Sequence, residues 1–517
     1  MKKRLLTVMA IALIATPVFA EGFDSIQPAN PFDATPINAN TIALPIKKAT
    51  LTHNSLHNQY VISFDRFMQS NVKSAYRDFK ILIETMQDSD YAYMKMAENM
   101  ASIGFFNLSD MAISKIEDKS LSDLLVEDIK LYYSPKFKLK QDDEIYLGEV
   151  FSNIVYNAQS REATYELVRN DYLMKNSDYA NYLVALGYLK SNDFIDAKNY
   201  IDLAIQKNPE NLNYKKLKAE ILSQSKKSKD AIKLVEDIKN QNLYSNVFMS
   251  KVNSLEQYVL YKSKKNYSDK MYHLGYYYYY ENEPAKSVRS LQNAFTTKKK
   301  HNKDVYALLS RVYFDTQDFE KAQDNALKAT KIDGHNATAL LVLGDLSYRN
   351  KDYKSALKYY KDANSNDKSA SISLVKVAQT YEQLGKNKKA IEIYEKILKS
   401  YSDSYIAYYK IALNDKSKEI PYLKKALAIN MEFKDAWIDL GRVEFERRNI
   451  YQAKKYLSIA NYIDENDFRY YYYQGLIAKY QGVNEEAVKY FKKSLLLNPN
   501  YVKAKEELSI WSKTFLL

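Results

Sequence analysis

The chain of 517 residues contains no cysteine, only 11 glycines and 10 prolines, and only five histidines. The absence of cysteine excludes disulfides, a cysteine nucleophile and a lipid anchor on cysteine, so the folded chain depends on packing alone. No Gly-rich loop follows a strand-like segment, so a phosphate-binding loop is not predicted. No apolar run is long enough to cross a bilayer as a permanent anchor.

The few histidines do not form a pattern typical of a metal or catalytic site. His53 and His57 are four residues apart and would share one face of a helix, but no third ligand stands near them. His273 falls on a predicted helix, where a packed or solvent-edge imidazole is expected. We therefore predict no catalytic residue, no cofactor and no metal, and the protein is not expected to be an enzyme. An active site within residues 58–175 is the weakest alternative.

The net charge of +13 comes from 76 lysines and arginines against 63 acidic residues. These basic residues are spread along the chain, so a nucleic-acid partner is not predicted. Two interpretations stay open. The charge either attracts anionic partners such as envelope polymers, lipid head groups or acidic peptides, or it reflects lysine-rich outer helix faces.

The first twenty residues have the pattern of a secretory signal. Basic residues 2–4 precede an apolar run over residues 5–15, Pro17 breaks the helix, and compact residues precede Glu21. We predict a signal peptide over residues 1–20, and its removal lowers the net charge from +13 to +10. The short signal and the Lys-, Asn- and Tyr-rich composition indicate a bacterial protein, exported to the periplasm or secreted. Residues 21–57 contain four prolines and predict a flexible leader.

A small residue recurs along the chain, and other residue types follow it at fixed offsets. After Gly475 come a small residue at +12 (Ala487), a large ring at +16 (Phe491), a small or polar residue at +19 (Ser494) and a proline at +24 (Pro499). This pattern resembles the tetratricopeptide repeat, a pair of antiparallel helices with a period of 34 residues. The small positions are Ala185, Ala219, Gly275, Ser310, Gly344, Ala378, Ala412, Gly441 and Gly475.

The resemblance implies an all-α fold, a right-handed α-solenoid of tetratricopeptide-type helix pairs with a C-terminal capping helix. The two helices of a pair approach closely at the small positions, so Leu457 should fill the gap beside Gly441. The unit at Ala412 is predicted to be five residues short. The predicted order is divergent helical hairpins over 58–177, repeats over 178–245, an interrupting helix over 246–267, repeats over 268–501 and the capping helix over 502–517.

In this family the first helix of each pair lines a concave groove. Positions −6, −3, +1 and +4 from the small residue share the groove face, and here they are rich in tyrosine. Tyrosine combines apolar area and a hydrogen-bonding tip with little entropy loss, which suits a binding surface. Tyr278 is predicted to pack inside its repeat. The predicted groove residues are Tyr179, Tyr182, Tyr272, Tyr276, Tyr279, Arg311, Phe314, Tyr348, Tyr409, Arg442, Phe445, Arg469 and Tyr472.

These features predict a non-catalytic scaffold of the bacterial cell envelope that binds a protein or peptide partner in the groove. Binding of a glycan or peptidoglycan strand along the same groove is the alternative, although amides, which sugars favour, are scarce there. Because 48 of the 517 residues are tyrosine, composition alone is a competing explanation for part of the aromatic wall. Capture of chaperone C-terminal carboxylates is not expected, since no asparagine follows the small residues.

Overall fold

The computed structural model describes residues 51–85, 90–157, 159–225, 227–240, 246–296, 302–366, 372–400 and 404–514. The described residues form helices joined by short turns and contain no strand, as predicted. The predicted signal peptide and residues 21–50 of the predicted leader lie outside them. The first described helix begins at Leu51 rather than at residue 58, and residues 46–68 indeed contain no proline or glycine to interrupt it.

Most of the described helices pair with a sequence neighbour. The helices of the N-terminal region are α2 (Leu51–Met68), α3 (Val72–Thr85), α4 (Asp90–Ser102), α5 (Phe106–Ser114), α6 (Lys119–Tyr132), α7 (Gln141–Val155), α8 (Ser160–Val168) and α9 (Asp171–Asn176). The next helices are α10 (Asp178–Lys190), α11 (Phe194–Lys207), α12 (Leu212–Gln224), α13 (Ser228–Lys239), α14 (Asn246–Ser263), α15 (Tyr267–Tyr280), α16 (Pro284–Asn293), α17 (Lys303–Asp315), α18 (Phe319–Ile332), α19 (Ala337–Arg349) and α20 (Tyr353–Asn366). The last are α21 (Ile372–Gln383), α22 (Asn387–Ser400), α23 (Tyr405–Ala412), α24 (Glu419–Ile429), α25 (Lys434–Glu446), α26 (Ile450–Ile463), α27 (Phe468–Tyr480), α28 (Asn484–Leu497) and α29 (Val502–Thr514).

The small positions bring the two helices of a pair into close contact. A Cβ added at Gly441 would lie 2.5 Å from Leu457 Cγ, and one at Gly475 would lie 2.5 Å from the ring of Phe491. Real Cβ atoms do not approach this closely, so only glycine fits there without a shift. The predicted packing of the residue at +16 on the small residue is therefore confirmed. The unit at Ala412 is short, since its first helix α23 has 8 residues.

After seven of the nine small positions, the residue seven positions later has a positive φ and turns the chain between the two helices of the pair. Examples are Asn192 (φ 61°), Lys351 (φ 61°) and Gly482 (φ 79°). The left-handed conformation reverses the chain within a few residues, which keeps the two helices of the pair in contact.

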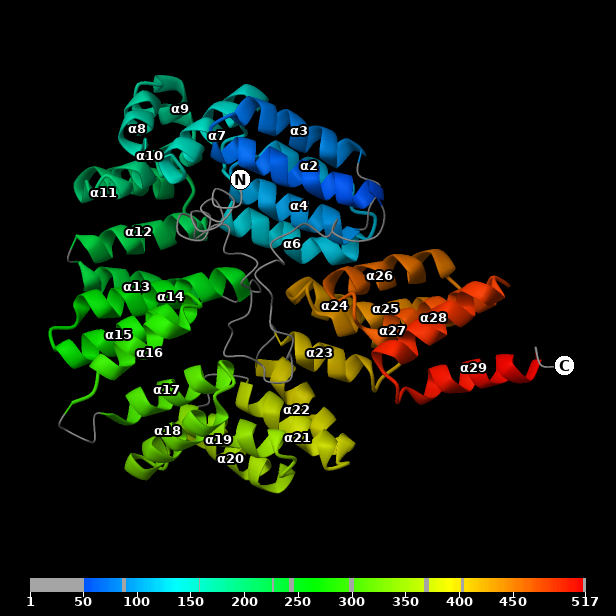
Figure 1. Ribbon diagram of the computed structural model, residues 1–517. Coiled ribbons are helices and arrows are strands. Elements are labelled where there is room, and N and C mark those ends of the chain that lie inside the picture. Colours follow the sequence, from blue (N-terminus) through cyan, green and yellow to red (C-terminus); the bar gives the residue numbers. More distant parts are fainter. Residues whose placement is uncertain are drawn as a thin grey trace, which may run out of the picture.

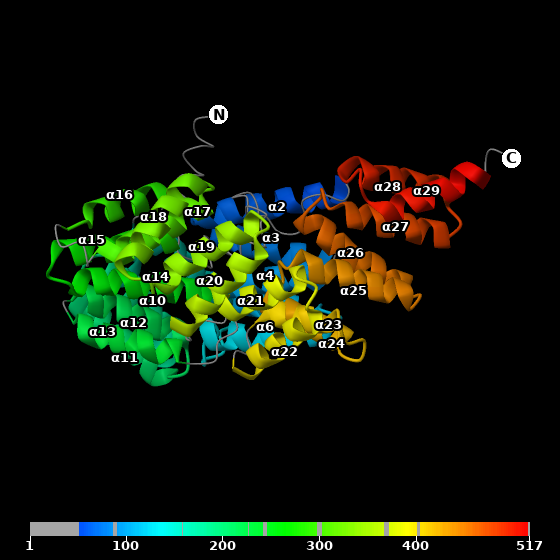
Figure 2. The same ribbon diagram turned by 90° about the horizontal axis from the view of Figure 1, so that it is seen from below.

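The solenoid closes on itself. Figure 1 shows the helices following each other around a ring, so that α24–α26 return to the side of α4 and α6. The view from below also places these segments together (Figure 2). One hydrophobic core cluster accordingly contains buried residues from both ends of the chain, such as Met94 and Leu457.

A charged cluster joins the two ends. The buried carboxylate of Asp90 accepts the backbone N–H groups of Glu117 and Asp118 at 2.9 and 3.0 Å. Lys455 of α26 reaches Asp90 at 3.3 Å and Glu117 at 2.9 Å, and the Tyr456 hydroxyl donates to Asp118 at 3.0 Å. We call these five residues the closing cluster.

Aromatic and ionic contacts extend the closing cluster. The Tyr91 hydroxyl donates to Glu432 at 2.5 Å, and the Tyr91 ring meets the buried Trp437 edge to face with centroids 6.2 Å apart. Lys95 also pairs with Glu432, at 2.8 Å, and Lys424 pairs with Asp118 at 2.8 Å. The closed ring is thus held by buried rings and by charges that are mostly withdrawn from water.

Reversing the two lysines should open the ring. In Lys424→Glu with Lys455→Glu, like charges face Asp90 and Asp118, which costs several kcal/mol. We expect a larger radius of gyration in small-angle X-ray scattering with little loss of helicity by circular dichroism. Lys454→Glu is the control, because Lys454 lies on the same helix as Lys455 but donates an exposed hydrogen bond to the Gln481 side chain at 3.0 Å. An unchanged scattering profile for the double variant would show that closure does not depend on these pairs.

Candidate functional site

The predicted groove residues fall into three groups along the ring, and about half of them are buried. The side chains of Tyr179, Tyr182, Tyr279, Arg311, Phe314, Tyr409 and Tyr472 are buried. Those of Tyr272, Tyr276, Tyr348, Arg442, Phe445 and Arg469 are half-buried. The expectation of an open aromatic wall is therefore wrong for the buried set, because first helices of neighbouring pairs approach closely enough to cover these positions.

The first group builds a stack of rings at α10 and α12. The rings of Tyr179 and Tyr182 stack with centroids 5.8 Å apart, and Tyr182 stacks on Tyr214 at 5.1 Å. Phe106 of α5 meets Tyr179 edge to face at 5.0 Å, so the stack reaches the N-terminal hairpins. Aromatic pairs at these separations contribute beyond their buried area.

Asp178 anchors this stack. Its fully buried carboxylate accepts the backbone N–H groups of Lys136 and Phe137, the Asn208 amide at 2.9 Å and the Tyr214 hydroxyl at 3.2 Å. A buried carboxylate with this many donors is fully hydrogen-bonded, so it holds its neighbours in position.

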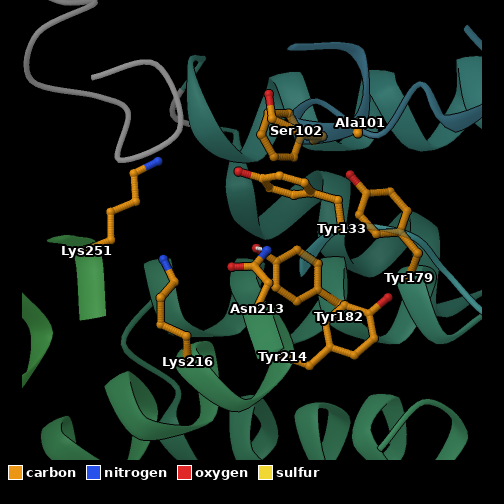
Figure 3. A pocket seen from close by; sticks show the side chains of 10 residues that line it. Ala101, Ser102, Tyr133, Tyr179, Tyr182, Asn213, Tyr214, Lys216 and Lys251 are labelled. Atoms are coloured by element: carbon orange, nitrogen blue, oxygen red, sulfur yellow. Dashed lines mark hydrogen bonds between the residues drawn. The ribbon is translucent and has the colours of Figure 1, made fainter. Parts of the chain in front are cut away.

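A pocket opens beside the stack, and Figure 3 shows the tyrosine rings on one side of it and two lysines on the other. The Tyr179 hydroxyl is buried, has no hydrogen-bond partner among the described residues, and lies against the Gly104 turn. The Asn213 amide donates to the Tyr182 hydroxyl at 3.3 Å. The lining residues are Ala101, Ser102, Tyr133, Phe151, Tyr179, Tyr182, Asn213, Tyr214, Lys216 and Lys251. We call this the tyrosine pocket.

Of the residues that line the tyrosine pocket, the sequence predicted Tyr179 and Tyr182 and did not predict the others. Asn213 and Lys216 stand at −6 and −3 from Ala219, so the same groove rule applied to that unit would have found them. Tyr133 and Lys251 lie outside the regular repeats, and no periodic signal points to them.

A buried acid lies behind the tyrosine pocket. Glu144 is fully buried on α7, where Asn107 N donates to it at 2.7 Å and the Tyr76 hydroxyl donates at 3.2 Å. Burial raises the pKa of Glu144 to about 7, although these hydrogen bonds favour the charged form. The charge of Glu144 in turn contributes, after burial, to a raised pKa of Tyr179.

The raised pKa of Glu144 predicts a pH dependence of stability. The folded state holds the proton more tightly than the unfolded state, so stability is lost as pH rises from about 4.5 through about 7. We expect a loss of roughly 1–3 kcal/mol over this window, which Glu144→Gln should abolish. Urea unfolding at pH 5 and pH 8 measures it, and an equal pH slope in both proteins would contradict the assignment.

The second group forms a buried ion network. Arg311 on α17 pairs with Asp315 at 2.9 Å and with Asp345 of α19 at 3.0 Å. Lys376 of α21 reaches Asp345 at 2.5 Å, and the Tyr360 hydroxyl donates to it at 2.8 Å. Burial lowers the pKa of Lys376 to about 8, against the pull of Asp345. We call this set the Asp345 network, and it joins three successive first helices.

The third group lies on α23, α25 and α27, and its polar and charged side chains are also paired with acidic residues. The Tyr409 hydroxyl donates to Asp439 at 2.9 Å, and Arg442 binds Asp439 and Glu419. Arg469 pairs with Asp467 at 2.6 Å. Burial would raise the pKa of Asp467, but Arg469 and Lys434 lower it to about 2. These charges therefore stabilise contacts between repeats rather than standing open to a ligand.

The burial of the tyrosines in the run Tyr276–Tyr280 differs from the prediction. Tyr278 was expected to pack inside its repeat, but it is half-buried, with Lys286 above its ring at 5.7 Å. Tyr279 is the buried ring, and its hydroxyl donates to Asp315 at 2.9 Å. The Tyr279 ring is buried because its hydroxyl bonds to Asp315 of the Asp345 network, whereas the Tyr278 ring lies beside the first turn of α16.

The described residues contain no cluster suited to a metal ion. His273 is a packed imidazole whose Nδ1 lies 2.9 Å from Gln257 Oε1, and burial lowers its pKa to about 4. The side chains of His53 and His57 lie outside the described part. Of the helices described, none has the length and apolar character needed to cross a membrane.

Comparison with protein families agrees with the helix pairs and their small positions. Models described as "Tetratricopeptide repeat" match residues 307–370, 373–404 and 468–501, and one described as "Fis1 C-terminal tetratricopeptide repeat" matches residues 180–229. The chain is a tetratricopeptide repeat protein. Its helix pairs belong to a kind of protein that serves as an interaction scaffold.

Three solved structures illustrate what this chain is similar to. The structure titled "Crystal structure of MamA" is 29% identical and matches 31% of this chain and 97% of its own, with a TM-score of 0.26. The structure titled "Crystal structure of APC/C hetero-tetramer Cut9-Hcn1" is 13% identical and matches 91% of this chain and 98% of its own, with a TM-score of 0.44. YrrB is 16% identical and matches 43% of this chain and 99% of its own, with a TM-score of 0.26. No curated protein matches.

Proposed function

We propose that this protein is a non-catalytic scaffold of the bacterial cell envelope that holds a protein or peptide partner against the first-helix face of its repeats. The observation that carries the proposal is the pair of half-buried rings on α15. Tyr272 and Tyr276 stack with centroids 6.0 Å apart, and both occupy groove positions of their repeat. A preformed stack keeps apolar area and hydroxyl groups in place, so a ligand loses little entropy in using it.

Export supports the envelope setting of the proposal. The basic residues 2–4, the apolar run and the compact residues before Glu21 form a secretory signal pattern, and a chain without cysteine tolerates an oxidising compartment. The scaffold then acts in the periplasm or outside the cell. Neither a cofactor nor a nucleic acid is part of the proposal.

The test compares partner binding through two surfaces of the same helix, α15. Tyr272→Ala with Tyr276→Ala should weaken binding of the partner by about 2 kcal/mol, because aromatic anchors dominate interfaces. Tyr278→Ala is the matched control, since its ring lies under Lys286 on the side of α16. The partner is identified by mass spectrometry of envelope proteins retained by the immobilised chain, and its affinity is then measured by calorimetry.

The same experiment separates the glycan alternative. The half-buried, stacked rings of Tyr272 and Tyr276 are also a surface on which sugar rings can stack, which favours glycan binding along the same groove as the second candidate. Retention on purified peptidoglycan, lost in the double variant, would identify it. Equal binding of every ligand by the double variant and the control would contradict the first-helix face as the site.

A further inference from the structure

Lysines lie over tyrosine rings at the same positions of three repeats. The tyrosine stands at +3 from the small residue and the lysine at +11. The pairs are Tyr278 with Lys286, Tyr313 with Lys321 and Tyr381 with Lys389, and their ammonium groups lie 5.7, 5.3 and 6.0 Å from the ring centroids. An ammonium group at this distance is attracted to the ring. The positions +3 and +11 are not among the predicted groove positions.

In two of these repeats an acidic residue at +8 neutralises the lysine. Glu283 pairs with Lys286 at 2.9 Å, and Asp318 pairs with Lys321 at 2.6 Å. The third repeat has Lys386 at +8. A positive charge therefore stands where the other two repeats place a negative one.

A third lysine comes from the preceding helix pair. The Lys361 ammonium of α20 lies 5.2 Å from the centroid of the Tyr381 ring, which is half-buried. The pKa of Tyr381 is lowered, first by a hydrogen bond from Lys361 and then, against the effect of burial, by the positive charge of the three lysines. Three ammonium groups therefore act on one phenol hydroxyl. We call Tyr381, Lys361, Lys386 and Lys389 the Tyr381 cluster.

The positive charge of the Tyr381 cluster is not balanced by its surroundings. Among the described residues, no carboxylate forms an ion pair with Lys361, Lys386 or Lys389, and all three side chains are exposed. The adjoining helices α20 and α22 together contain seven lysines, no arginine and three acidic residues. The local field therefore favours an anionic ligand.

We propose that the Tyr381 cluster binds a phosphomonoester group of a soluble ligand. Such a group carries a charge of about −1.5 to −2 and three strong acceptor oxygens, so several ammonium groups can donate to it at once. The Tyr381 hydroxyl can donate a further hydrogen bond. A carboxylate carries a single charge and leaves more of the cluster unneutralised. The inference goes beyond the proposed function, because the cluster lies outside the groove positions.

The surface around the cluster favours a soluble ligand over a membrane. Faces that bind membranes combine basic residues with exposed apolar side chains. Between Leu327 and Leu413, no large hydrophobic side chain is exposed among the residues that the structure describes. A lipid head group would therefore have no apolar anchor beside it.

Calorimetric titration of the full chain with inorganic phosphate at low ionic strength tests the cluster. Lys386→Asp gives this repeat the acidic residue of its neighbours, and aspartate is favourable directly before a helix, so the variant should fold as well as the unchanged chain. We expect Lys386→Asp to weaken phosphate binding about tenfold and Lys361→Gln about fivefold. Lys321→Gln is the matched control and should leave phosphate binding unchanged, because Asp318 already neutralises Lys321.

The ionisation of Tyr381 gives a second measurement at the site itself. In a chain isotope-labelled at the tyrosine Cζ atoms, the NMR resonance that is missing from Tyr381→Phe reports this phenol. Bound phosphate should raise the pKa of Tyr381, because a negative group beside the hydroxyl disfavours the phenolate. Acetate at the same concentration should change this pKa much less.

Several outcomes would overturn the proposal. These are no binding of phosphate, equal phosphate binding by Lys386→Asp and Lys321→Gln, and acetate binding as strong as that of phosphate. Glycerol phosphate should bind like inorganic phosphate, whereas binding only to vesicles that contain phosphatidic acid would contradict a soluble ligand. Since partner capture through Tyr272 and Tyr276 is measured separately, either proposal can fail alone.

Discussion

Replacing Asp345 with alanine should destabilise the central repeats by about 3–5 kcal/mol. The fully buried Asp345 carboxylate faces Arg311 at 3.0 Å, Lys376 at 2.5 Å and the Tyr360 hydroxyl at 2.8 Å. Its removal leaves two cations in the interior without their shared partner, and a buried charge that loses its partner is far more costly than an exposed one.

Asp324→Ala is the matched control for this prediction. Asp324 and Lys328 form an ion pair of similar length on α18, but their side chains are 57% and 49% exposed. Loss of an exposed pair changes stability by less than about 1 kcal/mol. Because each repeat contacts mainly its neighbours, hydrogen exchange should locate the effect of Asp345→Ala in α17–α21. A similar unfolding profile for the two variants would contradict the Asp345 network as a stabilising element.

Gly441→Leu should have a comparable effect at the other end of the ring. A Cβ alone would lie 2.5 Å from Leu457 Cγ and 3.4 Å from the Ala453 carbonyl oxygen, so a leucine forces α25 and α26 apart. Overpacking of this kind costs roughly 1–3 kcal/mol or more. Since Lys455 and Tyr456 of α26 bind the N-terminal region, we expect the ring to loosen as well.

Gly334→Leu provides the comparison. The nearest atom to a Cβ at Gly334 is the Thr330 carbonyl oxygen at 3.8 Å, an ordinary contact. Thermal unfolding should therefore separate the two leucine variants. If both unfold alike, close packing at the small positions is not what sets the distance between the helices.

Contacts within one helix pair were the most predictable part of the fold. Gly441 with Leu457, and Gly475 with Phe491, are set by two backbones that must approach, so residue type at a fixed offset reveals them. Exposure along the first helices was less predictable, because it depends on how closely successive pairs stack. Tyr279 and Arg311 illustrate this, since both are covered by neighbouring pairs.

Contacts outside the period could not be predicted. The pocket residue Tyr133 directly follows α6, and Lys251 lies on α14. Neither helix follows the repeat, so a period of 34 residues contains no information on their position. The same holds for Asp90 and Lys455, which meet across 365 residues. Only the folded ring brings these side chains together.

The closed ring also has a consequence for the order of events during synthesis. At about 5–20 residues per second, a ribosome needs roughly 20–70 s to add the 365 residues that separate Asp90 from Lys455. Throughout that interval Tyr91 and the acidic residues beside it have been made, but the α25 and α26 surfaces that cover them have not. The first hairpins therefore keep apolar and acidic groups exposed until α25 and α26 have been made.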